Sequence, residues 1–333
     1  MGHTIQGKQV GNIGFGLMGL TWRASKKPDE ESFAVIKAAL ENGCSYLNGG
    51  EFYGAPDNNS LTLLSRYYER YPEDKDMILL NIKGCVFENL TPDSSPAAVR
   101  TSVENCVRLI GNKGRIDQFE PARKDPDVDI ETTIAALQEQ VQSGNIRGIS
   151  LSEVSAATIR RAAKVAKIES VEVELSLWCT EPLENGVVQA CADLDIPIIA
   201  YAPLGRGMLT GQLRSPADIP PGDFRHLLPR FQPAVFETNL RLVREVERLA
   251  ARRGCTPAQV AINWVLALGR RPGMPRIIPI PGASSPARVR ENAVEVGLSA
   301  AEMEELEGIL RVLGPVGTRY HAHGMEALDR SVE

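Results

Sequence analysis

The sequence predicts a parallel α/β fold, a (β/α)8 TIM barrel with long loops at the carboxyl ends of its strands. Short β-type runs begin at eight places, and segments of helical periodicity lie between them. Six of the seven gaps between successive strand starts span roughly 24 to 39 residues, which is the size of one βα unit. Eight such units in about 300 residues, with no break in composition, favour a closed barrel over an open doubly wound sheet.

The strand predictions rest on short runs that are rich in β-branched and other apolar residues. The clearest runs cover residues 77–83, 170–178 and 197–201. The predicted strands begin near Ile13, Ser45, Met77, Ile116, Ile146, Ser170, Pro197 and Arg276.

The helix predictions rest on capping signals and on apolar residues spaced three or four apart. Ser95 before Pro96 is typical of an N-cap and a first helical residue, and Thr256 before Pro257 repeats this pair. Helical spacing also predicts helices over about 33–40 and about 130–141, the second ending near Gly144.

The chain reads as one barrel domain, residues 1–333, because no Pro/Gly/Ser-rich linker divides it. The gap between the last two strands is far longer than the others. Its segment from about 206 to 236 is rich in Pro, Gly and Arg and indicates a long loop excursion, which is often functional. The tail, about 314–333, is polar, and we expect it to be partly loose.

Composition excludes several classes of function. The 333 residues are 43% hydrophobic with a net charge of −5, which excludes wholesale disorder and argues against nucleic acid as a partner. No apolar run of about 18 residues and no secretory signal is present, so we expect neither a membrane span nor secretion. Six cysteines without a CxxC pair and four histidines make a metal site improbable. These features predict a cytosolic globular protein with reduced thiols.

The segment Gly14-Phe-Gly16-Leu-Met-Gly19 matches the glycine pattern of a dinucleotide-binding turn. In such a turn the last glycine opens a helix, but here helical periodicity begins only near Asp29. We therefore interpret these glycines as a place where a strand end approaches another backbone closely.

Tyr53 and Lys83 are the strongest candidates for chemistry. Tyr53 follows the second predicted strand in Asn48-Gly-Gly-Glu-Phe-Tyr-Gly54, and Lys83 ends the third. Barrel geometry places both at the same mouth, and a nearby cation lowers a phenol pKa that starts near about 10. Tyr53 is then a credible proton donor. The alternative interpretation is a packed loop aromatic and a lysine whose ammonium reaches solvent.

Two glycine-containing loops follow the seventh and eighth strands, where barrels often bind phosphate through backbone N–H groups. The first is Tyr201-Ala-Pro-Leu-Gly-Arg-Gly207, and the second is Pro281-Gly-Ala-Ser-Ser285 with Arg288 on the helix behind it. Ser284, Ser285 and Arg288 are suited to a further phosphate. Ordinary turns and a helix cap are the alternative.

These residues resemble the aldo-keto reductases over nearly the whole chain, from Val10 to about Leu310. The most specific stretches are the motif around Tyr53, Ile116-Asp117, Ser143–Arg147 with Leu151–Glu153, Tyr201–Leu204 with Leu209–Gly211, Pro229–Gln232 and Ile277–Gly282. The sequence of residues 48–54 is similar to that of the fungal pyridoxal-reductase-like branch of this family.

The resemblance implies a barrel that binds NADP(H) in an extended form, with Tyr53 protonating a carbonyl oxygen and Lys83 assisting. It also implies cofactor contacts: Ser152, Glu153 and Glu172 near the carboxamide, Tyr201 stacked on the nicotinamide, Leu204, Gly205 and Gly207 along the pyrophosphate, Ser284 and Arg288 at the 2′-phosphate, and Glu291 and Asn292 at the adenine.

The chain departs from the pattern of the family it resembles. Asn48 stands where Asp is expected, Ala122 where His is expected, Glu172 where Gln is commoner and Leu175 where an aromatic is commoner. Loss of one donor to the substrate oxygen typically costs about 10²–10³-fold in rate. Loss of the Asp charge leaves Lys83 less neutralised, although Asn48 can still accept a hydrogen bond from it.

The leading hypothesis is an NADPH-dependent oxidoreductase that reduces an aldehyde to an alcohol, with pyridoxal as the named substrate. An alternative is a reductase or redox-neutral enzyme for a bulky carbonyl in specialised metabolism, and a third is a binding subunit that senses NADP(H). In the enzyme hypotheses the partner is a small-molecule carbonyl compound. We expect Trp22, Phe87, Ala122 and Trp178 to line its pocket. The sequence leaves the oligomeric state open.

Overall fold

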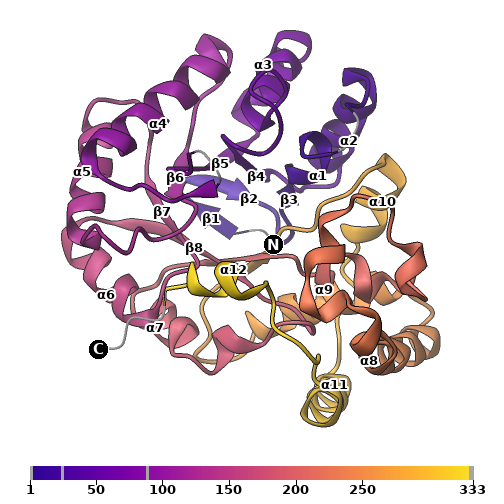
Figure 1. Ribbon diagram of the computed structural model, residues 1–333. Coiled ribbons are helices and arrows are strands. Elements are labelled where there is room, and N and C mark those ends of the chain that lie inside the picture. The colour runs from indigo at the N-terminus through magenta and orange to yellow at the C-terminus, as the bar shows by residue number, and fades with distance from the viewer. Residues whose placement is uncertain (1–2, 24–25, 88–89, 330–333) are drawn as a thin grey trace.

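The computed structural model describes residues 3–23, 26–87 and 90–329, and it confirms the (β/α)8 barrel. Eight parallel strands form one sheet, in which each strand neighbours the next in the chain (Figure 1). All eight lie where the sequence predicts strands. They are β3 (Phe15–Gly16), β4 (Tyr46–Gly50), β5 (Leu79–Gly84), β6 (Gln118–Pro121), β7 (Ile149–Ser152), β8 (Ile168–Glu174), β9 (Ile198–Tyr201) and β10 (Ile277–Pro279).

The glycines of the Gly14–Gly19 segment close the barrel. Gly14 N donates to Pro279 O at 2.9 Å and Gly16 N to Pro281 O at 3.3 Å, so the first strand joins the last. A Cβ on Gly14 would lie 2.7 Å from Tyr46 O, closer than real Cβ atoms come to other atoms. These contacts confirm the expected close backbone approach and exclude the dinucleotide-binding turn.

Helices surround the strands, and they begin where the capping signals place them. Ser95 accepts a hydrogen bond from Ala98 N at the start of α4, and Thr256 forms a capping box at the start of α9. The larger helices are α2 (Asp29–Glu41), α3 (Ser60–Arg70), α4 (Pro96–Ile110), α5 (Ile130–Gln142), α6 (Ala156–Val165), α7 (Val187–Asp193), α8 (Pro233–Arg253), α9 (Pro257–Leu268), α10 (Pro286–Asn292) and α11 (Ala300–Leu313).

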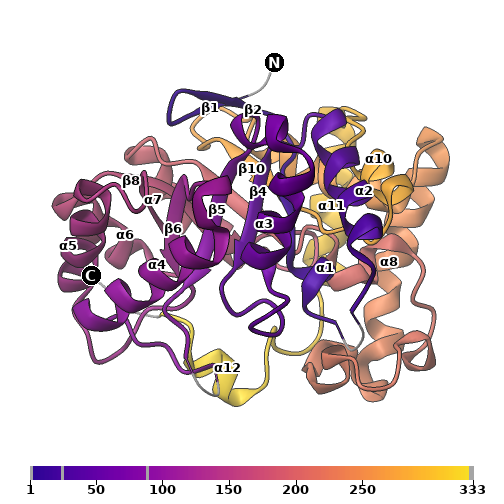
Figure 2. The same ribbon diagram turned by 90° about the horizontal axis from the view of Figure 1, so that it is seen from above.

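A β-hairpin that the sequence analysis missed covers the amino-terminal end of the barrel (Figure 2). Its strands are β1 (His3–Ile5) and β2 (Lys8–Val10), which pair antiparallel. Ile5 and Val10 are buried in one cluster with barrel residues Tyr46, Leu79, Ile199, Ile278 and Ile280. The hairpin therefore plugs the end of the barrel opposite the predicted site.

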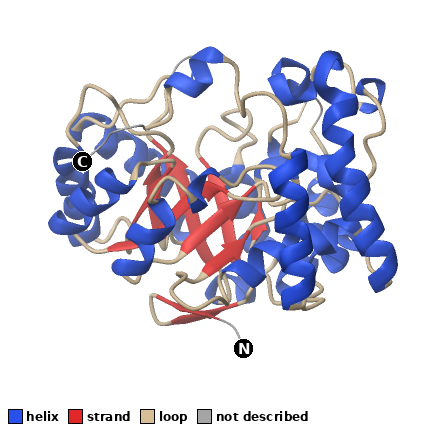
Figure 3. Ribbon diagram, turned by 90° about the horizontal axis from the view of Figure 1, so that it is seen from below, coloured by secondary structure: helices blue, strands red, loops and turns tan. Residues whose placement is uncertain are grey.

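Short helices and loops gather at the carboxyl end of the strands, where α12 (Ala322–Glu326) also lies (Figure 3). The 206–236 segment contains four 3₁₀ turns rather than a featureless loop, and α8 begins within it at Pro233. The remaining short elements are α1 (Met18–Thr21), η1 (Pro72–Asp76), η3 (Gly111–Lys113), η4 (Glu181–Leu183), η5 (Gly205–Thr210), η6 (Pro216–Asp218), η7 (Phe224–Leu227) and η8 (Pro229–Phe231).

None of the helices in the part of the chain that the structure describes is long and apolar enough to cross a membrane. The same residues contain no group of three or more His, Cys, Asp or Glu side chains arranged to hold a metal ion.

Candidate active site

Lys83 lies in a buried cluster of polar side chains at the carboxyl end of β5. Its Nζ donates to Asn48 Oδ1 at 3.0 Å and to Glu172 Oε1 at 2.5 Å. Glu120 Oε1 lies 3.1 Å from the same nitrogen, because β5 and β6 pair with Lys83 opposite Glu120. Asn48 Nδ2 donates to Glu172 Oε2 at 2.6 Å. The fold therefore joins three predicted site residues, Asn48, Lys83 and Glu172, through direct hydrogen bonds.

The expectation that Lys83 is poorly neutralised is wrong. Two carboxylates, neither of them at position 48, surround the ammonium in a site where Lys83 is only 4% exposed. Burial raises the pKa of Glu172 to about 8; the charge of Lys83 opposes this rise, and that of Glu120 adds to it. Burial by itself would lower the pKa of Lys83, but Glu172, Tyr53 and Glu120 together outweigh it, and the net shift is upward. Glu172 and Glu120 form a pair of carboxyl groups around Lys83. When this pair keeps one proton, the cluster carries one positive charge, on Lys83, and one negative charge on the pair.

Tyr53 packs beside this cluster. The Lys83 nitrogen lies 5.9 Å from the centre of the Tyr53 ring, and the rings of Phe52 and Trp22 lie 4.9 and 5.5 Å away. Burial raises the pKa of Tyr53 to about 12, and the opposing effect of Lys83 does not offset it. The net shift is thus opposite to the expected lowering, and Tyr53 keeps its proton at neutral pH.

The loop that carries Tyr53 is held from both sides. Glu51 N donates to Lys83 O at 2.8 Å, and the Glu51 carboxylate accepts hydrogen bonds from Asn105 Nδ2 and Ser102 Oγ on α4. On the other side, Thr21 Oγ1 donates to Tyr53 O at 2.6 Å. Gly50 is required here, because a Cβ would lie 2.8 Å from Tyr53 Cγ. These contacts restrict where the phenol can lie.

Arg123 stands next to the position where the family resemblance led us to expect histidine. Ala122 N donates to Gly84 O at 3.0 Å, so the chain leaves β6 beside the end of β5. Arg123 Nη1 donates to Ala122 O at 2.6 Å, and Nη2 donates to Tyr320 Oη at 3.4 Å. The site therefore contains a guanidinium beside the missing imidazole.

The C-terminal segment reaches over the mouth of the barrel. Arg319, only 6% exposed, pairs with Glu153 at 3.1 Å, Glu181 at 3.2 Å and Glu174 at 3.4 Å. Tyr320 Oη lies 2.8 Å from Tyr201 Oη, the residue expected to stack on the nicotinamide. Residues 319 and 320 are thus anchored on the ends of strands β7, β8 and β9.

The loop after β9 is tightly bent. Gly205, Arg206 and Gly207 all have positive φ, at 56°, 56° and 94°, and the bend turns the Arg206 side chain inward. Arg206 Nη2 donates to Glu174 Oε2 at 2.9 Å, and Nη1 donates to Arg319 O at 3.0 Å. Leu204 is half-buried beside this turn. The residues expected to contact the cofactor's pyrophosphate therefore lie on a turn that the side chain of Arg206 holds in place.

The loop after β10 presents the other expected cofactor residues. Ser284 is exposed, and Ser285 accepts a hydrogen bond from Arg288 N as the N-cap of α10. Arg288 Nη1 donates to Glu291 Oε2 at 2.7 Å, while Asn292 is buried. Ser284, Arg288 and Glu291 are grouped on one rim of the molecule.

Ser152 ends β7, the fifth strand of the barrel, and Glu153 follows it; the two residues differ in their bonding. Ser152 Oγ is buried and, within the described structure, has no hydrogen-bond partner. Glu153 has φ 52° and is already engaged by Arg319 and by Glu174 N. Cys85 and Ala202, which directly follow β5 and β9, also have positive φ, so backbone strain gathers at this mouth.

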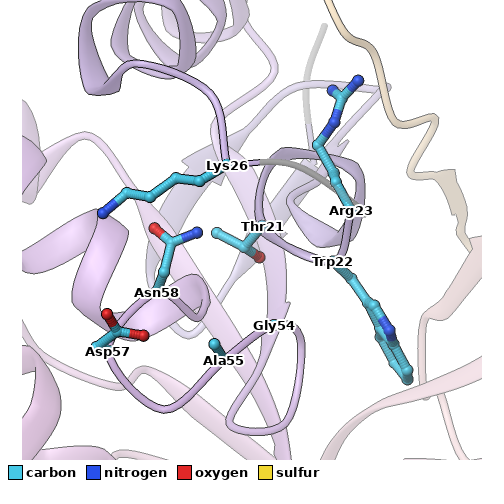
Figure 4. Close-up of a pocket in the computed structure, with 8 residues that line it drawn as sticks. All are labelled: Thr21, Trp22, Arg23, Lys26, Gly54, Ala55, Asp57 and Asn58. Atoms are coloured by element: carbon cyan, nitrogen blue, oxygen red, sulfur yellow. The ribbon is translucent and has the colours of Figure 1, made fainter.

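A cavity of about 470 Å³ opens between the end of α1 and the Tyr53 loop (Figure 4). Thr21, Trp22 and Arg23 line it from one side, and Gly54, Ala55, Asp57 and Asn58 line it from the other. Figure 4 shows Lys26 and Trp22 on opposite sides of Thr21. Of the four expected pocket residues, Trp22 is the one that lines this cavity.

The other expected pocket residues lie elsewhere. Trp178 is only 1% exposed and packs in the core against Phe231, because Gly205 without a Cβ allows the backbone to sit directly on its ring. Trp178 is thus a core residue and not part of a pocket surface. Ala122 is also buried, whereas Phe87 is exposed beyond β5.

The sequence analysis missed several residues of the site. Glu120, Arg123, Glu174, Arg319 and Tyr320 all contact predicted site residues. A charged residue inside a buried strand was a usable signal for Glu120 and Glu174, since burying a charge costs free energy unless it is paired. No comparable signal marked Arg319 and Tyr320 in a polar tail.

Comparison with known proteins agrees with this geometry. Residues 12–311 match the aldo/keto reductase family. The chain is 40% identical to the probable pyridoxal reductase 2 of Schizosaccharomyces pombe, covering 95% of this chain and 96% of that one. It is 39% identical to a putative pyridoxal reductase of Saccharomyces cerevisiae, covering 93% and 95%. It is also 34% identical to an S. pombe protein named aldo-keto reductase yakc [NADP(+)], covering 95% of each.

Solved structures agree on the fold. The glycerol dehydrogenase of Gluconobacter oxydans superposes with a TM-score of 0.81 at 24% identity, covering 96% of this chain and 98% of that one. The family match spans most of the chain, and the yeast relatives confirm the expected resemblance to fungal pyridoxal reductases. This chain therefore belongs to the aldo/keto reductase family.

Proposed function

We propose that the protein reduces an aldehyde to an alcohol with NADPH, and that pyridoxal is its substrate. The observation that carries the proposal is the convergence of Tyr53 and Lys83, which are 30 residues apart in the chain, at one end of the barrel. The names of the yeast relatives, two pyridoxal reductases and an NADP(+) aldo-keto reductase, support the choice of substrate and cofactor.

The residues present fit a nicotinamide cofactor. Ser152 Oγ is a buried hydroxyl with no hydrogen-bond partner among the described residues, as expected of a group that bonds a carboxamide when the cofactor binds. Tyr201 offers a half-buried ring, and Gly205 and Gly207 offer backbone without side chains. Ser284 and Arg288 would meet the 2′-phosphate, with Glu291 and Asn292 at the adenine. NADPH, when bound, supplies the hydride that reaches the carbonyl carbon.

Tyr53 is the proposed general acid. Its raised pKa, about 12, keeps the hydroxyl protonated, so it can donate to the carbonyl oxygen as negative charge develops there. Lys83 stays charged because Glu172, Tyr53 and Glu120 together outweigh its burial, and its ammonium favours the phenolate that remains after proton transfer. Asn48 and Glu172 position this ammonium through hydrogen bonds.

We place the substrate beside Trp22. The Trp22 ring lies 5.5 Å from that of Tyr53, so a planar aromatic aldehyde held against Trp22 would lie close to the proposed acid. The six cysteines are free thiols, which is compatible with the reducing cytosol, where we propose that the enzyme acts.

The test is NADPH oxidation in the presence of pyridoxal, with the wild type compared with Tyr53→Phe. Removing the proton donor should lower kcat by about 10²–10⁴-fold, the usual contribution of a positioned general acid. NADPH should still raise the melting temperature of both proteins, because binding to the native state stabilises it. Equal rates in the two proteins would refute the role of Tyr53. A thermal shift with no turnover of any aldehyde would favour an NADP(H)-binding subunit instead.

A further inference from the structure

Arg123 has no carboxylate partner in the mouth of the barrel. Among the described residues, no Asp or Glu oxygen lies within 4.0 Å of its guanidinium, and its protein acceptors are Ala122 O and Tyr320 Oη. A guanidinium has five N–H donors, so most of its donor capacity is unused. The two neighbouring arginines differ, since Arg206 and Arg319 both pair with Glu174.

The charge of Glu153 acts on Arg123 from a distance, but among the described residues no ion pair or hydrogen bond joins the two, and Glu153 is paired with Arg319 instead. The side chain is half-buried, and its guanidinium lies 5.9 Å from the Tyr320 ring. Its charge also pulls the pKa of Tyr53 downward against the effect of burial, which places it within electrostatic reach of the proposed acid. A partly desolvated cation without a partner is costly unless a ligand supplies the charge.

We propose that Arg123 selects aldehydes that carry an ionised oxygen on the carbon next to the one bearing the aldehyde group. This inference rests on the proposed aldehyde reductase function and deepens it. When the formyl group is turned toward the neighbouring oxyanion, the two oxygens lie in one plane on the same side, and a cation that binds both offsets their repulsion. They present two acceptors to the planar guanidinium fork, as a carboxylate does.

The departure at position 122 agrees with this assignment. Ala122 has no donor for the substrate oxygen, and Arg123 provides donors one residue later in the chain. Pyridoxal belongs to the selected class, because its ring hydroxyl is adjacent to its aldehyde group. The guanidinium would therefore take over orientation of the substrate while Tyr53 remains the proton donor.

The experiment compares two substrates that differ in the adjacent oxygen. Salicylaldehyde and 2-methoxybenzaldehyde are reduced by wild type, Arg123→Met and Arg123→Lys at a pH where the salicylaldehyde hydroxyl is ionised. The exposed Arg100 on α4 supplies the matched control, Arg100→Met. We expect Arg123→Met to lower kcat/KM for salicylaldehyde about 10- to 100-fold more than for the methoxy compound, the range of one charge-assisted hydrogen bond. Arg123→Lys keeps the charge without the fork and should lie between.

A binding measurement separates this inference from the proposed function. Thermal shifts with pyridoxal and with its 3-O-methyl ether report recognition without turnover, and melting curves show whether each variant is folded. The wild type should prefer pyridoxal, and Arg123→Met should lose that preference. The inference is overturned if Arg123→Met lowers kcat/KM equally for salicylaldehyde and 2-methoxybenzaldehyde, or weakens the binding of pyridoxal and of its ether equally. This holds whether or not the wild type reduces pyridoxal. If the folded wild type does not oxidise NADPH but still prefers pyridoxal through Arg123, the proposed function is overturned and the inference about Arg123 is not.

Discussion

Asn48 and Glu172 both accept a hydrogen bond from the ammonium of Lys83. The negative charge beside it comes from the pair of carboxyl groups that Glu172 forms with Glu120. In the family pattern this charge comes from position 48, and position 172 is commonly neutral. Compared with the family pattern, the carboxylate in this chain thus stands on another strand of the barrel, and Lys83 is still charged.

This arrangement predicts a pH-dependent stability. The pKa of Glu172 is about 8 in the folded protein against 4.5 for the free group, so between about pH 5 and 8 the folded state holds a proton that the unfolded chain has lost. The free energy of unfolding then falls as the pH rises through that window, by up to about 1.4 kcal/mol per pH unit.

Urea unfolding of wild type and Glu172→Gln at several pH values measures this effect. The glutamine variant cannot ionise, so its stability should change less between about pH 5 and 8. Parallel curves for the two proteins would contradict the shifted pKa.

At the scale of the elements, the C-terminal segment is attached mainly through Arg319. Its pairs with Glu153 and Glu174 join residues after α11 to the ends of β7 and β8, and all three side chains are buried. Asp329 adds a second attachment by accepting from Ser155 N at the start of α6. The part of this polar tail that the structure describes is thus held against the barrel mouth.

Replacing Arg319 should release this attachment. Arg319→Met leaves the buried carboxylate of Glu153 without its paired cation, whereas Glu174 keeps Arg206, and we expect the free energy of unfolding to fall by about 3–5 kcal/mol. Denaturant unfolding measures the loss, and faster proteolysis of the 315–329 segment should accompany it. The exposed Arg311→Met on α11 is the control. A stability equal to that of the control would show that the pairs contribute little.

At the scale of the whole molecule, the two ends of the barrel have separate tasks. The β1–β2 hairpin seals the amino-terminal end with Ile5 and Val10, both at most 4% exposed, while the described site residues gather at the other end. Figure 2 shows the hairpin and α12 at opposite ends of the molecule. Stability and catalysis can therefore be altered independently.

Truncation of the plug tests this separation. Ile5→Ala should lower the free energy of unfolding by about 2–4 kcal/mol through lost burial and a residual cavity, and kcat of the folded enzyme should not change. Gln9→Ala on the exposed side of the hairpin is the control. Denaturant unfolding together with steady-state kinetics measures both quantities. A large fall in kcat for Ile5→Ala would contradict the separation of the two ends.

Local sequence was sufficient for the repeating units and for the two central residues of the site. The strand runs and the caps at Ser95 and Thr256 depend on neighbours a few residues away, and the structure confirms them. Tyr53 and Lys83 could be paired because the carboxyl ends of parallel strands meet at one mouth. The hairpin was missed because each strand has three residues, too few for a periodic signal.

The sequence by itself determined the barrel, its eight units and the residue types at its mouth, because these follow from short-range periodicity and turn chemistry. Only the tertiary structure decided that the pair Glu172 and Glu120 neutralises Lys83 and that Trp178 is a core residue. It also decided that Arg319 has carboxylate partners, while Arg123 has none within 4.0 Å in the part of the chain that the structure describes. Such partners lie far apart in the chain, for example 89 residues between Lys83 and Glu172. Their pairing depends on strand register and side-chain burial, which no local pattern encodes.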